Sequence, residues 1–272
     1  MTKRPRVLAT LEGYAVEGGF DRPHEPATCF APTIALGRHE GPGDAEGLWR
    51  DYERVIDLVP SLGLDGVRLT IEWARVEPRR GVHDDDALAR YEQVIGHARS
   101  LGLDVTIALF GDVWPSWAGM EAWLLPWVVP YATQFATRVV GRLGEAATGV
   151  VVFTDAEKLV TRGYLDETAP PWRRGAVADA TSVRQQVQHV VGLLSADATV
   201  GPRLVGSTRT IELDHTIAAI TEQRRRASTC DEVYVRSLVK GRGPTSAPGG
   251  LVGHDTGVWS TSAAEALLDV LR

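Results

Sequence analysis

Cysteine is almost absent from the chain, which contains only Cys29 and Cys230 among its 272 residues. The two are far apart and have no metal-type spacing, so we expect reduced thiols instead of a disulfide, and no metal site. Long apolar runs are also missing: no stretch approaches the roughly 18 residues of a membrane span, and no signal-peptide-like segment follows the basic N-terminus. These absences predict a cytoplasmic protein without a membrane partner.

Positive charge is scarce as well. The chain has 29 Lys and Arg against 35 Asp and Glu, a net charge of −6, and its one basic cluster is Arg224–Arg226. A chain with this charge balance lacks the basic surface patch that binds nucleic acid, so we expect no nucleic-acid partner. No Gly-rich loop lies between a strand and a helix as a phosphate site requires, so we expect no cofactor and a small molecule as the partner.

Strand-like and helix-like segments alternate along the whole chain, which is typical of a parallel α/β fold in a single domain, residues 1–272. The predicted strands are Val7–Val16, Asp65–Trp73, Asp104–Phe110, Val150–Thr154, Arg203–Ile211 and Val233–Val239. The predicted helices are Ala45–Leu62, Asp84–Leu101, Leu125–Leu143, Thr181–Leu194, Asp214–Ala227 and Thr261–Leu271. A closed TIM (β/α)8 barrel has eight strands. Six recognisable units therefore predict an incomplete or reduced TIM barrel.

Three predicted helices end in the same Leu-Gly sequence, at Leu62–Asp65, Leu101–Asp104 and Leu143–Gly144. Glycine just past a helix is the usual left-handed terminator. We expect a sharp turn into the next strand at each.

Acidic residues recur where the predicted strands end, which is where barrel enzymes keep their sites. The apolar strand Val150–Thr154 is followed by Asp155 and Glu157, and Glu157 is the first candidate for chemistry. An alternative is that these two acids only cap the next helix. The other strand ends carry Glu12, Glu17, Glu72, Arg75, Asp112 and Glu212.

Tryptophans accompany these acids at Trp73, Trp114 and Trp117. Flat apolar rings beside carboxylates suit the hydrophobic faces of sugar rings, although for any single tryptophan a place in the core is the more common role. The candidate substrate-binding residues are Glu12, Glu72, Trp73, Asp112, Trp114, Asp155 and Glu212.

Several motifs together resemble glycoside hydrolase family 1, the retaining β-glycosidases with a TIM-barrel fold. They are EGYAVEGGF, GDAEGLWRDYERVIDLVPSLGLDGVRLTIEWARVEP, ALFGDVWPSW, TDAEKLVTRGYLDETAP, CDEVYVRSL and HDTGVWSTSAAEALLDVLR. The resemblance implies that Glu157 is the catalytic acid/base and that Arg75 is the catalytic-site arginine that flanks the nucleophile.

The chain also departs from the family pattern. Where the family has a glutamine, a histidine and an asparagine for sugar recognition, this sequence has Ala15, Gly111 and Ala156. It has no counterpart of the family's seventh-strand Thr-Glu-Asn-Gly motif with the nucleophilic glutamate. Retaining hydrolysis needs a second carboxyl about 5–5.5 Å from the first. Another acid of the same face would have to supply it.

Three functions remain open from the sequence. The first is a divergent glycosidase-like enzyme acting on a glycoside or polyol-like molecule with Glu157 as general acid/base. The second is a non-hydrolytic isomerase, lyase or cyclase that tailors a natural product. The third is an inactive pseudoglycosidase that binds a ligand or partner, and an oligomer could then cover the open edge of an incomplete barrel.

Overall fold

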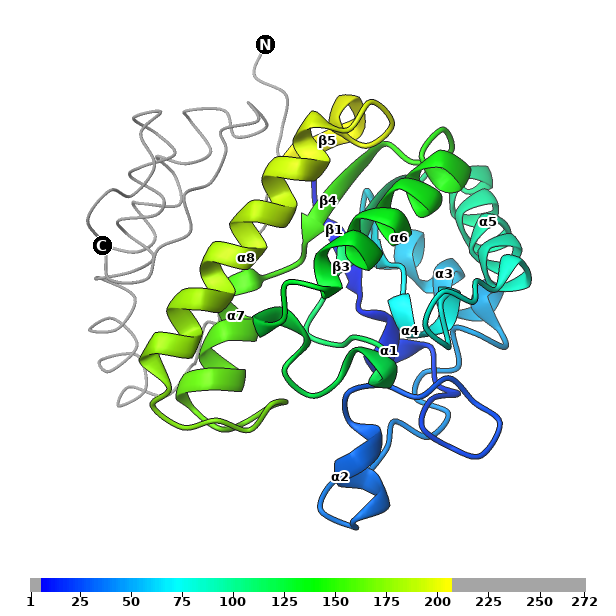
Figure 1. Ribbon diagram of the computed structural model, residues 1–272. Coiled ribbons are helices and arrows are strands. Elements are labelled where there is room, and N and C mark those ends of the chain that lie inside the picture. Colours follow the sequence, from blue (N-terminus) through cyan, green and yellow to red (C-terminus); the bar gives the residue numbers. More distant parts are fainter. Residues whose placement is uncertain (1–5, 207–272) are drawn as a thin grey trace, which may run out of the picture.

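The computed structural model describes residues 6–206 of the chain. Within them, one parallel sheet has the strand order β1-β2-β3-β4-β5 (Figure 1). The strands are β1 (Leu8–Leu11), β2 (Gly66–Thr70), β3 (Asp104–Phe110), β4 (Gly149–Phe153) and β5 (Leu204–Gly206). Each strand pairs with the next one along the chain, in the consecutive order of a barrel and not the reversing order of a doubly wound sheet. The described residues therefore form part of a TIM-type barrel, as predicted.

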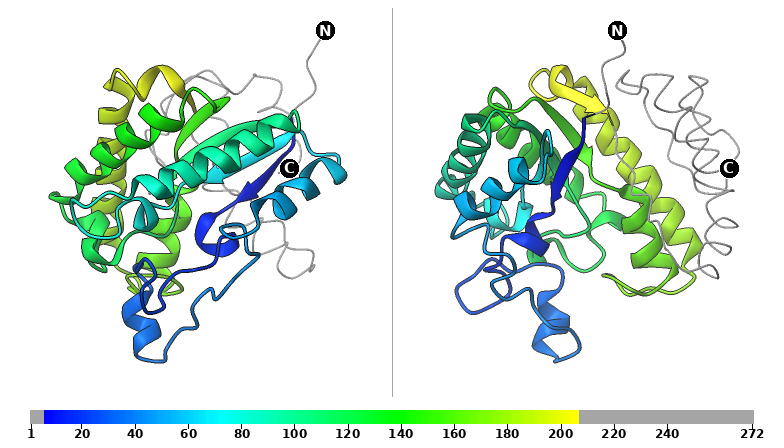
Figure 2. Two further views of the ribbon diagram at one scale, coloured as in Figure 1. Left: turned by 90° about the vertical axis from the view of Figure 1, so that its right-hand side faces the viewer. Right: turned by 180° about the vertical axis from the view of Figure 1, so that it is seen from behind.

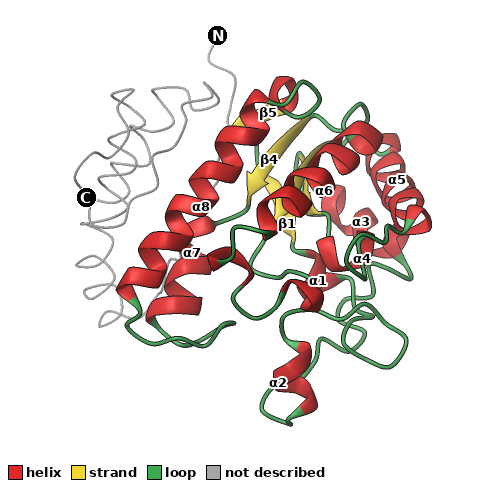
Figure 3. Cartoon of the chain, in the orientation of Figure 1, coloured by secondary structure: helices red, strands yellow, loops and turns green. Residues whose placement is uncertain are grey.

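Four long helices cross between strands and cover the sheet from outside (Figure 3). They are α3 (Tyr52–Ser61), α5 (Asp85–Ser100), α6 (Val128–Leu143) and α8 (Val177–Ala196). Short helices follow strand ends or lie in loops: α1 (Gly13–Val16), α2 (Ala31–Ala35), α4 (Trp73–Val76) and α7 (Ala156–Val160). Single turns complete the list: η1 (Ser116–Ala118), η2 (Ala122–Leu124), the π turn η3 (Thr161–Leu165) and η4 (Gly201–Arg203). The segment with α2 projects from the body next to α1 (Figure 2).

The strand predictions agree with the structure best in the middle of the sheet. Strand β3 has the predicted bounds, whereas β1 ends at Leu11, because the chain turns into α1 at Gly13. A side chain at Gly13 would collide with the Glu72 side chain, so the turn depends on this glycine. The predicted elements Asp214–Ala227, Val233–Val239 and Thr261–Leu271 lie outside the described residues.

Two helix starts show where the prediction agrees with the structure and where it does not. Helix α3 begins at Tyr52 and not at residue 45, after a turn in which Gly47 has a φ of 75°. The start of α5 is as predicted, since the Asp84 carboxylate accepts a 2.9 Å hydrogen bond from the Ala87 backbone N–H.

Two of the three Leu-Gly turns have the expected left-handed glycine. Gly63 has a φ of 71° and Gly102 a φ of 77°. Gly144 is different, with a φ of −65°. A Cβ there would lie 2.5 Å from the Val140 carbonyl oxygen and 2.8 Å from Arg203 Cδ, so close packing and not a left-handed backbone favours the third glycine.

The core lies between the sheet and its helices, and aromatic rings fill much of it. All of β4 is buried. Trp73, Phe110, Trp123 and Phe135 pack together with ring centroids 5.4–6.2 Å apart. Cys29 is a free, buried thiol. No helix among residues 6–206 is long and apolar enough to cross a membrane.

Candidate active site

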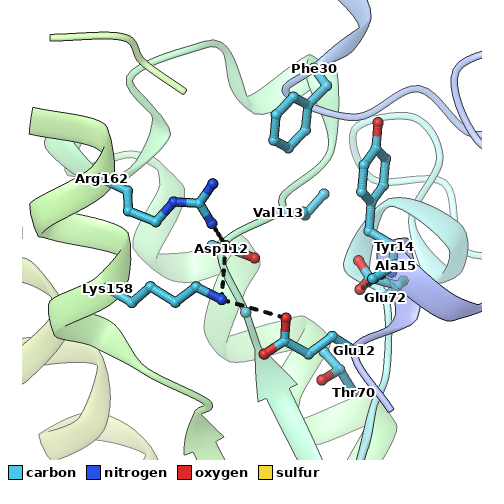
Figure 4. A pocket seen from close by; sticks show the side chains of 11 residues that line it. Glu12, Tyr14, Ala15, Phe30, Thr70, Glu72, Asp112, Val113, Lys158 and Arg162 are labelled. Atoms are coloured by element: carbon cyan, nitrogen blue, oxygen red, sulfur yellow. Dashed lines mark hydrogen bonds and ion pairs between the residues drawn. The ribbon is translucent and has the colours of Figure 1, made fainter. Parts of the chain in front are cut away.

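A pocket of about 180 Å³ opens at the C-terminal ends of β1, β2, β3 and β4 (Figure 4). Glu12 follows β1, Glu72 follows β2 and Asp112 follows β3, so three of the predicted strand-end acids meet in one place. The lining residues are Glu12, Tyr14, Ala15, Phe30, Thr70, Glu72, Gly111, Asp112, Val113, Lys158 and Arg162.

Four charged side chains form a network across the pocket. The Lys158 Nζ lies 3.7 Å from Glu12 Oε2 and also 3.7 Å from Asp112 Oδ2. Asp112 Oδ2 also accepts a 3.3 Å bond from Arg162 Nη1. The sequence prediction did not include Lys158 or Arg162. Their helical spacing after the β4 strand end is the signal that could have identified them.

Glu72 is the most buried acid of the pocket, with 4% of its surface exposed. Its Oε1 accepts a 2.9 Å hydrogen bond from the Tyr14 backbone N–H. Burial raises the pKa of the Glu72 carboxyl well above its usual value, and the nearby Glu17 carboxylate raises this pKa further. Glu72 therefore holds its proton to a higher pH than an exposed glutamate.

Arg75 lies in a separate buried cluster. Its Nε donates a 2.8 Å hydrogen bond to Glu17 Oε2, and its guanidinium stacks between the Phe20 and Trp49 rings, 4.1 and 3.9 Å from their centroids. The described lining of the pocket does not include Arg75. Its place after β2, in α4, turns the side chain toward the α1 loop and leaves Glu72 at the pocket.

Glu157 does not face the pocket either. Arg184 of α8 binds it through Nε to Oε1 and Nη2 to Oε2, both at 2.9 Å. Consecutive residues of a helix point about 100° apart. In α7, Lys158 is directed into the pocket and Glu157 is directed at α8. Glu157 is therefore absent from the described lining residues.

Asp155 is the N-cap of α7, where its Oδ1 accepts a 2.9 Å hydrogen bond from the Lys158 backbone N–H. Asp155 therefore caps the helix after β4, which was the alternative to a role in chemistry. Glu212, the remaining acidic candidate, lies outside the described residues.

The two candidate tryptophans belong to the core. Trp73 is 2% exposed and donates from Nε1 to Glu77 Oε2 at 2.8 Å, and Trp114 is 1% exposed and donates to the Gly119 carbonyl. The aromatic residues of the pocket are instead Tyr14 and Phe30, whose rings stack with centroids 5.1 Å apart. Burying a large apolar side chain stabilises the folded state in proportion to the area removed from water, which favours the core over an open pocket for these tryptophans.

Arg68 is another charged residue that the sequence prediction missed. It shares one face of β2 with Thr70, because side chains two apart in a strand point the same way. Burial lowers the pKa of Arg68, while the Glu12 and Asp155 carboxylates act in the opposite direction. Its buried Nε has no hydrogen-bond partner within the described part of the chain.

Ala15 and Gly111 both line the pocket, at two positions where the family resemblance implies sugar-binding polar side chains. The third, Ala156, is 6% exposed and packs in the core. Within residues 6–206, no group of three or more His, Cys, Asp or Glu side chains is arranged to hold a metal ion.

Comparison with known proteins gives weak sequence similarity and strong structural similarity. No family model matches the chain. The beta-glucosidase-like SFR2 of Oryza sativa subsp. japonica is 27% identical over 162 residues, which are 55% of this chain and 25% of that protein. The galactolipid galactosyltransferase SFR2 of Arabidopsis thaliana is 29% identical over 76 residues, 26% of this chain and 12% of that protein. The chain thus matches a quarter or less of the length of these relatives.

The structural similarity extends over most of the chain. The beta-glycosidase from Pyrococcus horikoshii has a TM-score of 0.69 at 17% identity, over 86% of this chain and 55% of that one. The GH1 beta-glucosidase from Exiguobacterium antarcticum B7 has a TM-score of 0.66 at 17% identity, over 88% of this chain and 56% of that one. These similarities confirm the resemblance found in the sequence: the chain is similar to the GH1 β-glycosidases, and its described residues form part of a barrel like theirs.

Proposed function

We propose that the chain binds a glycoside or polyol-like small molecule in the pocket at the ends of β1–β4 and transfers a proton to it from Glu72. The observation that carries this proposal is a buried, proton-retaining carboxyl that lines a pocket together with two ion-paired carboxylates. A carboxyl whose pKa is raised by burial is suited to act as a general acid. The stacked rings of Tyr14 and Phe30 provide an apolar surface for a sugar ring.

The arrangement of Glu12 and Asp112 favours proton transfer by one residue over a mechanism with a covalent intermediate. Both carboxylates lie 3.7 Å from the Lys158 ammonium, so the two paired oxygens are separated by no more than twice that distance. The Lys158 ammonium pairs with both carboxylates, so neither is a free nucleophile for a covalent intermediate. Proton transfer from Glu72 requires no nucleophile from the protein: in an isomerase- or lyase-type step no external nucleophile is needed, and in a hydrolase-type step the leaving oxygen takes the proton while water forms the new bond.

Glu157 has a positioning role in this proposal, in place of the acid/base role that the family resemblance implies. Its carboxylate is bound by the Arg184 guanidinium, which attaches the first turn of α7 to α8. The relatives' names, beta-glucosidase-like and galactolipid galactosyltransferase, support a glycoside as the ligand class.

A second candidate function is ligand binding without turnover. The observation that favours it is the same Lys158 ammonium, which neutralises the two carboxylates that could otherwise activate water.

The experiment compares Glu72→Gln with Glu157→Gln as matched amide variants. Turnover of 4-nitrophenyl β-D-glucoside and β-D-galactoside is followed by nitrophenol release, and binding is followed by calorimetry. We expect Glu72→Gln to lose about 10²–10⁴-fold in rate while retaining affinity, and Glu157→Gln, whose amide oxygen can still accept a bond from Arg184, to lose far less. Loss confined to Glu157→Gln would return the acid/base role to Glu157. Binding by a wild-type protein that never releases nitrophenol would favour the second candidate.

A further inference from the structure

Two carboxyl groups, those of Glu72 and Glu17, approach each other behind the wall of the pocket. Glu72 follows β2 and lines the pocket, whereas Glu17 follows α1 and its side chain is completely buried. A Cβ at Gly13 would lie 2.7 Å from Glu72 Oε1 and 2.9 Å from Glu17 Oε1. The two carboxyl groups therefore flank the same glycine and are close neighbours in the interior.

Glu17 has a hydrogen-bond donor at each of its oxygens. Its Oε1 accepts a 2.7 Å bond from the Tyr91 hydroxyl, and its Oε2 accepts a 2.8 Å bond from Arg75 Nε. The Tyr91 oxygen in turn accepts a 3.1 Å bond from the Glu72 backbone N–H, so its own hydrogen is directed at Glu17. An ionised carboxylate accepts through both oxygens, whereas a protonated one must donate from one of them. These bonds therefore favour the ionised form of Glu17.

The Glu72 carboxyl is bonded differently. Its Oε1 accepts one bond, from the Tyr14 backbone N–H, and its Oε2 makes no hydrogen bond to any of residues 6–206. Burial raises the pKa of Glu17 too, but the Arg75 and Tyr91 bonds act against that rise, and Glu72 has no comparable cation bonded to it. Two close carboxyls resist ionising together. The proton of the pair therefore belongs on Glu72, which faces the pocket.

The charges on the pocket side of Glu72 largely cancel one another. Asp112 also raises the pKa of Glu72, but this carboxylate pairs with both Lys158 and Arg162. Glu12, across the pocket, pairs with Lys158 as well. None of these groups acts on Glu72 as an uncompensated buried charge.

On the interior side, the groups that face Glu72 are Glu17, Arg75 and two tyrosines. Arg75 lowers the pKa of Glu72, but its charge is offset by the carboxylate bonded to it. Burial raises the pKa of both Tyr14 and Tyr91, so these phenols stay neutral at physiological pH. Glu17 is thus the negative charge whose removal would change Glu72 most.

We propose that Glu17 is a positioning residue of the candidate active site: its negative charge, held by Arg75 and Tyr91, keeps the proton on Glu72. The inference rests on the proposed function, in which Glu72 is the proton donor. Glu17 is absent from the described lining of the pocket, so it acts only through Glu72. Its charge sets the pH range in which the donor is protonated.

The first test is the pH dependence of kcat for 4-nitrophenyl β-D-glucoside in wild type and Glu17→Gln. Without the charge at position 17, Glu72 loses its proton at lower pH. We expect the rate of Glu17→Gln to fall about tenfold at neutral pH and to stay near that of wild type at pH 4.5, the ordinary glutamate pKa. A loss that is equal at every pH would show a merely structural role and overturn the inference.

The matched control is Glu77→Gln. Glu77 is also a buried glutamate with a donor at each oxygen, Trp73 Nε1 and the Gly81 backbone N–H, at 2.8 and 2.7 Å. It is not among the groups that shift the pKa of Glu72. Its variant should keep the wild-type pH profile, even where it lowers stability.

Carbon-13 NMR of the glutamate carboxyls tests the same charge arrangement in wild type, without turnover and without a variant at position 17. The Glu72 signal is identified by its loss in Glu72→Gln. We expect Glu72 to keep its proton to a higher pH than Glu17 does. The reverse order would refute the inference and leave Glu72 as a proton donor whose pKa is raised by burial alone. If wild type neither binds nor converts the glycoside probes, the proposed function fails, and the titration order still decides which carboxyl holds the charge.

Discussion

Glu157 and Arg184 form a bidentate ion pair that joins α7 to α8, with only 15% and 14% of their side chains exposed. The pair fixes the rotation of α7 about its axis. Because Lys158 is the next residue, this rotation also decides that the lysine points into the pocket.

Breaking this pair should destabilise the protein. We expect Glu157→Gln and Arg184→Met each to lower the free energy of unfolding, with a coupling of about 1–3 kcal/mol in a double-mutant cycle measured by urea denaturation. The same cycle on the exposed pair Glu92 and Arg142 is the control and should show weaker coupling. Equal coupling for both pairs would contradict the expectation that burial strengthens the Glu157–Arg184 pair.

Glu72 should make stability depend on pH. A carboxyl whose pKa is higher in the folded than in the unfolded protein adds to the free energy of unfolding. This contribution is complete below the ordinary glutamate pKa of 4.5. That stabilisation is lost as the pH rises through the folded pKa. The free energy of unfolding of wild type should therefore fall more as the pH rises above 4.5 than that of Glu72→Gln, whose amide does not titrate. Parallel curves for the two proteins would refute a raised pKa.

Gly13 should tolerate no side chain. A Cβ there would collide with Glu72 Cγ and lie 2.9 Å from Glu17 Oε1, so we expect Gly13→Ala to cost about 1–3 kcal/mol of unfolding free energy. Gly96→Ala in α5 is the control, since a Cβ there meets nothing within 4 Å. This control should stabilise the helix by about 0.5–1 kcal/mol. A thermal melt of both variants decides the point, and a neutral Gly13→Ala would speak against the close approach.

Arg75→Lys should destabilise the protein without weakening ligand binding. Lysine lacks the planar group that stacks between Phe20 and Trp49 while bonding to Glu17, so we expect a loss of about 2–4 kcal/mol. Chemical denaturation measures the loss, and calorimetry with the probes above measures affinity. A change confined to affinity would place Arg75 at the ligand after all.

The barrel pattern could be predicted from the sequence because it is carried by local signals. Buried apolar strands such as β3, the Asp84 cap and the left-handed Gly63 and Gly102 are each recognisable within a few residues. The end of β1 could not be predicted this way. It depends on the contact of Gly13 with Glu72, which is distant in the sequence.

The site was predictable to the level of strand ends but not of side-chain directions. Glu12, Glu72 and Asp112 follow different strands and meet in the pocket. Whether the Glu157 side chain points into the pocket depends on the orientation of α7 after β4. Neighbouring residues of a helix point in different directions, so Lys158 lines the pocket and Glu157 does not. A family motif gives only the order of residues along the chain. The side-chain direction of Glu157 is set by its ion pair with Arg184, which lies 27 positions later and is not part of the motif.

Gly111 lines the pocket and Gly13 lies against Glu72, one of its lining residues, and the two glycines differ in how freely they can be replaced. At Gly13 the neighbouring carboxyls exclude any side chain, whereas a Cβ at Gly111 would meet only Thr154 Oγ1 at 3.7 Å and Thr70 Cγ2 at 3.8 Å, ordinary contact distances. Position 111 is therefore an accessible point for redesign: a histidine or another polar residue could be introduced there to alter which molecules the pocket selects, without rebuilding the barrel around it.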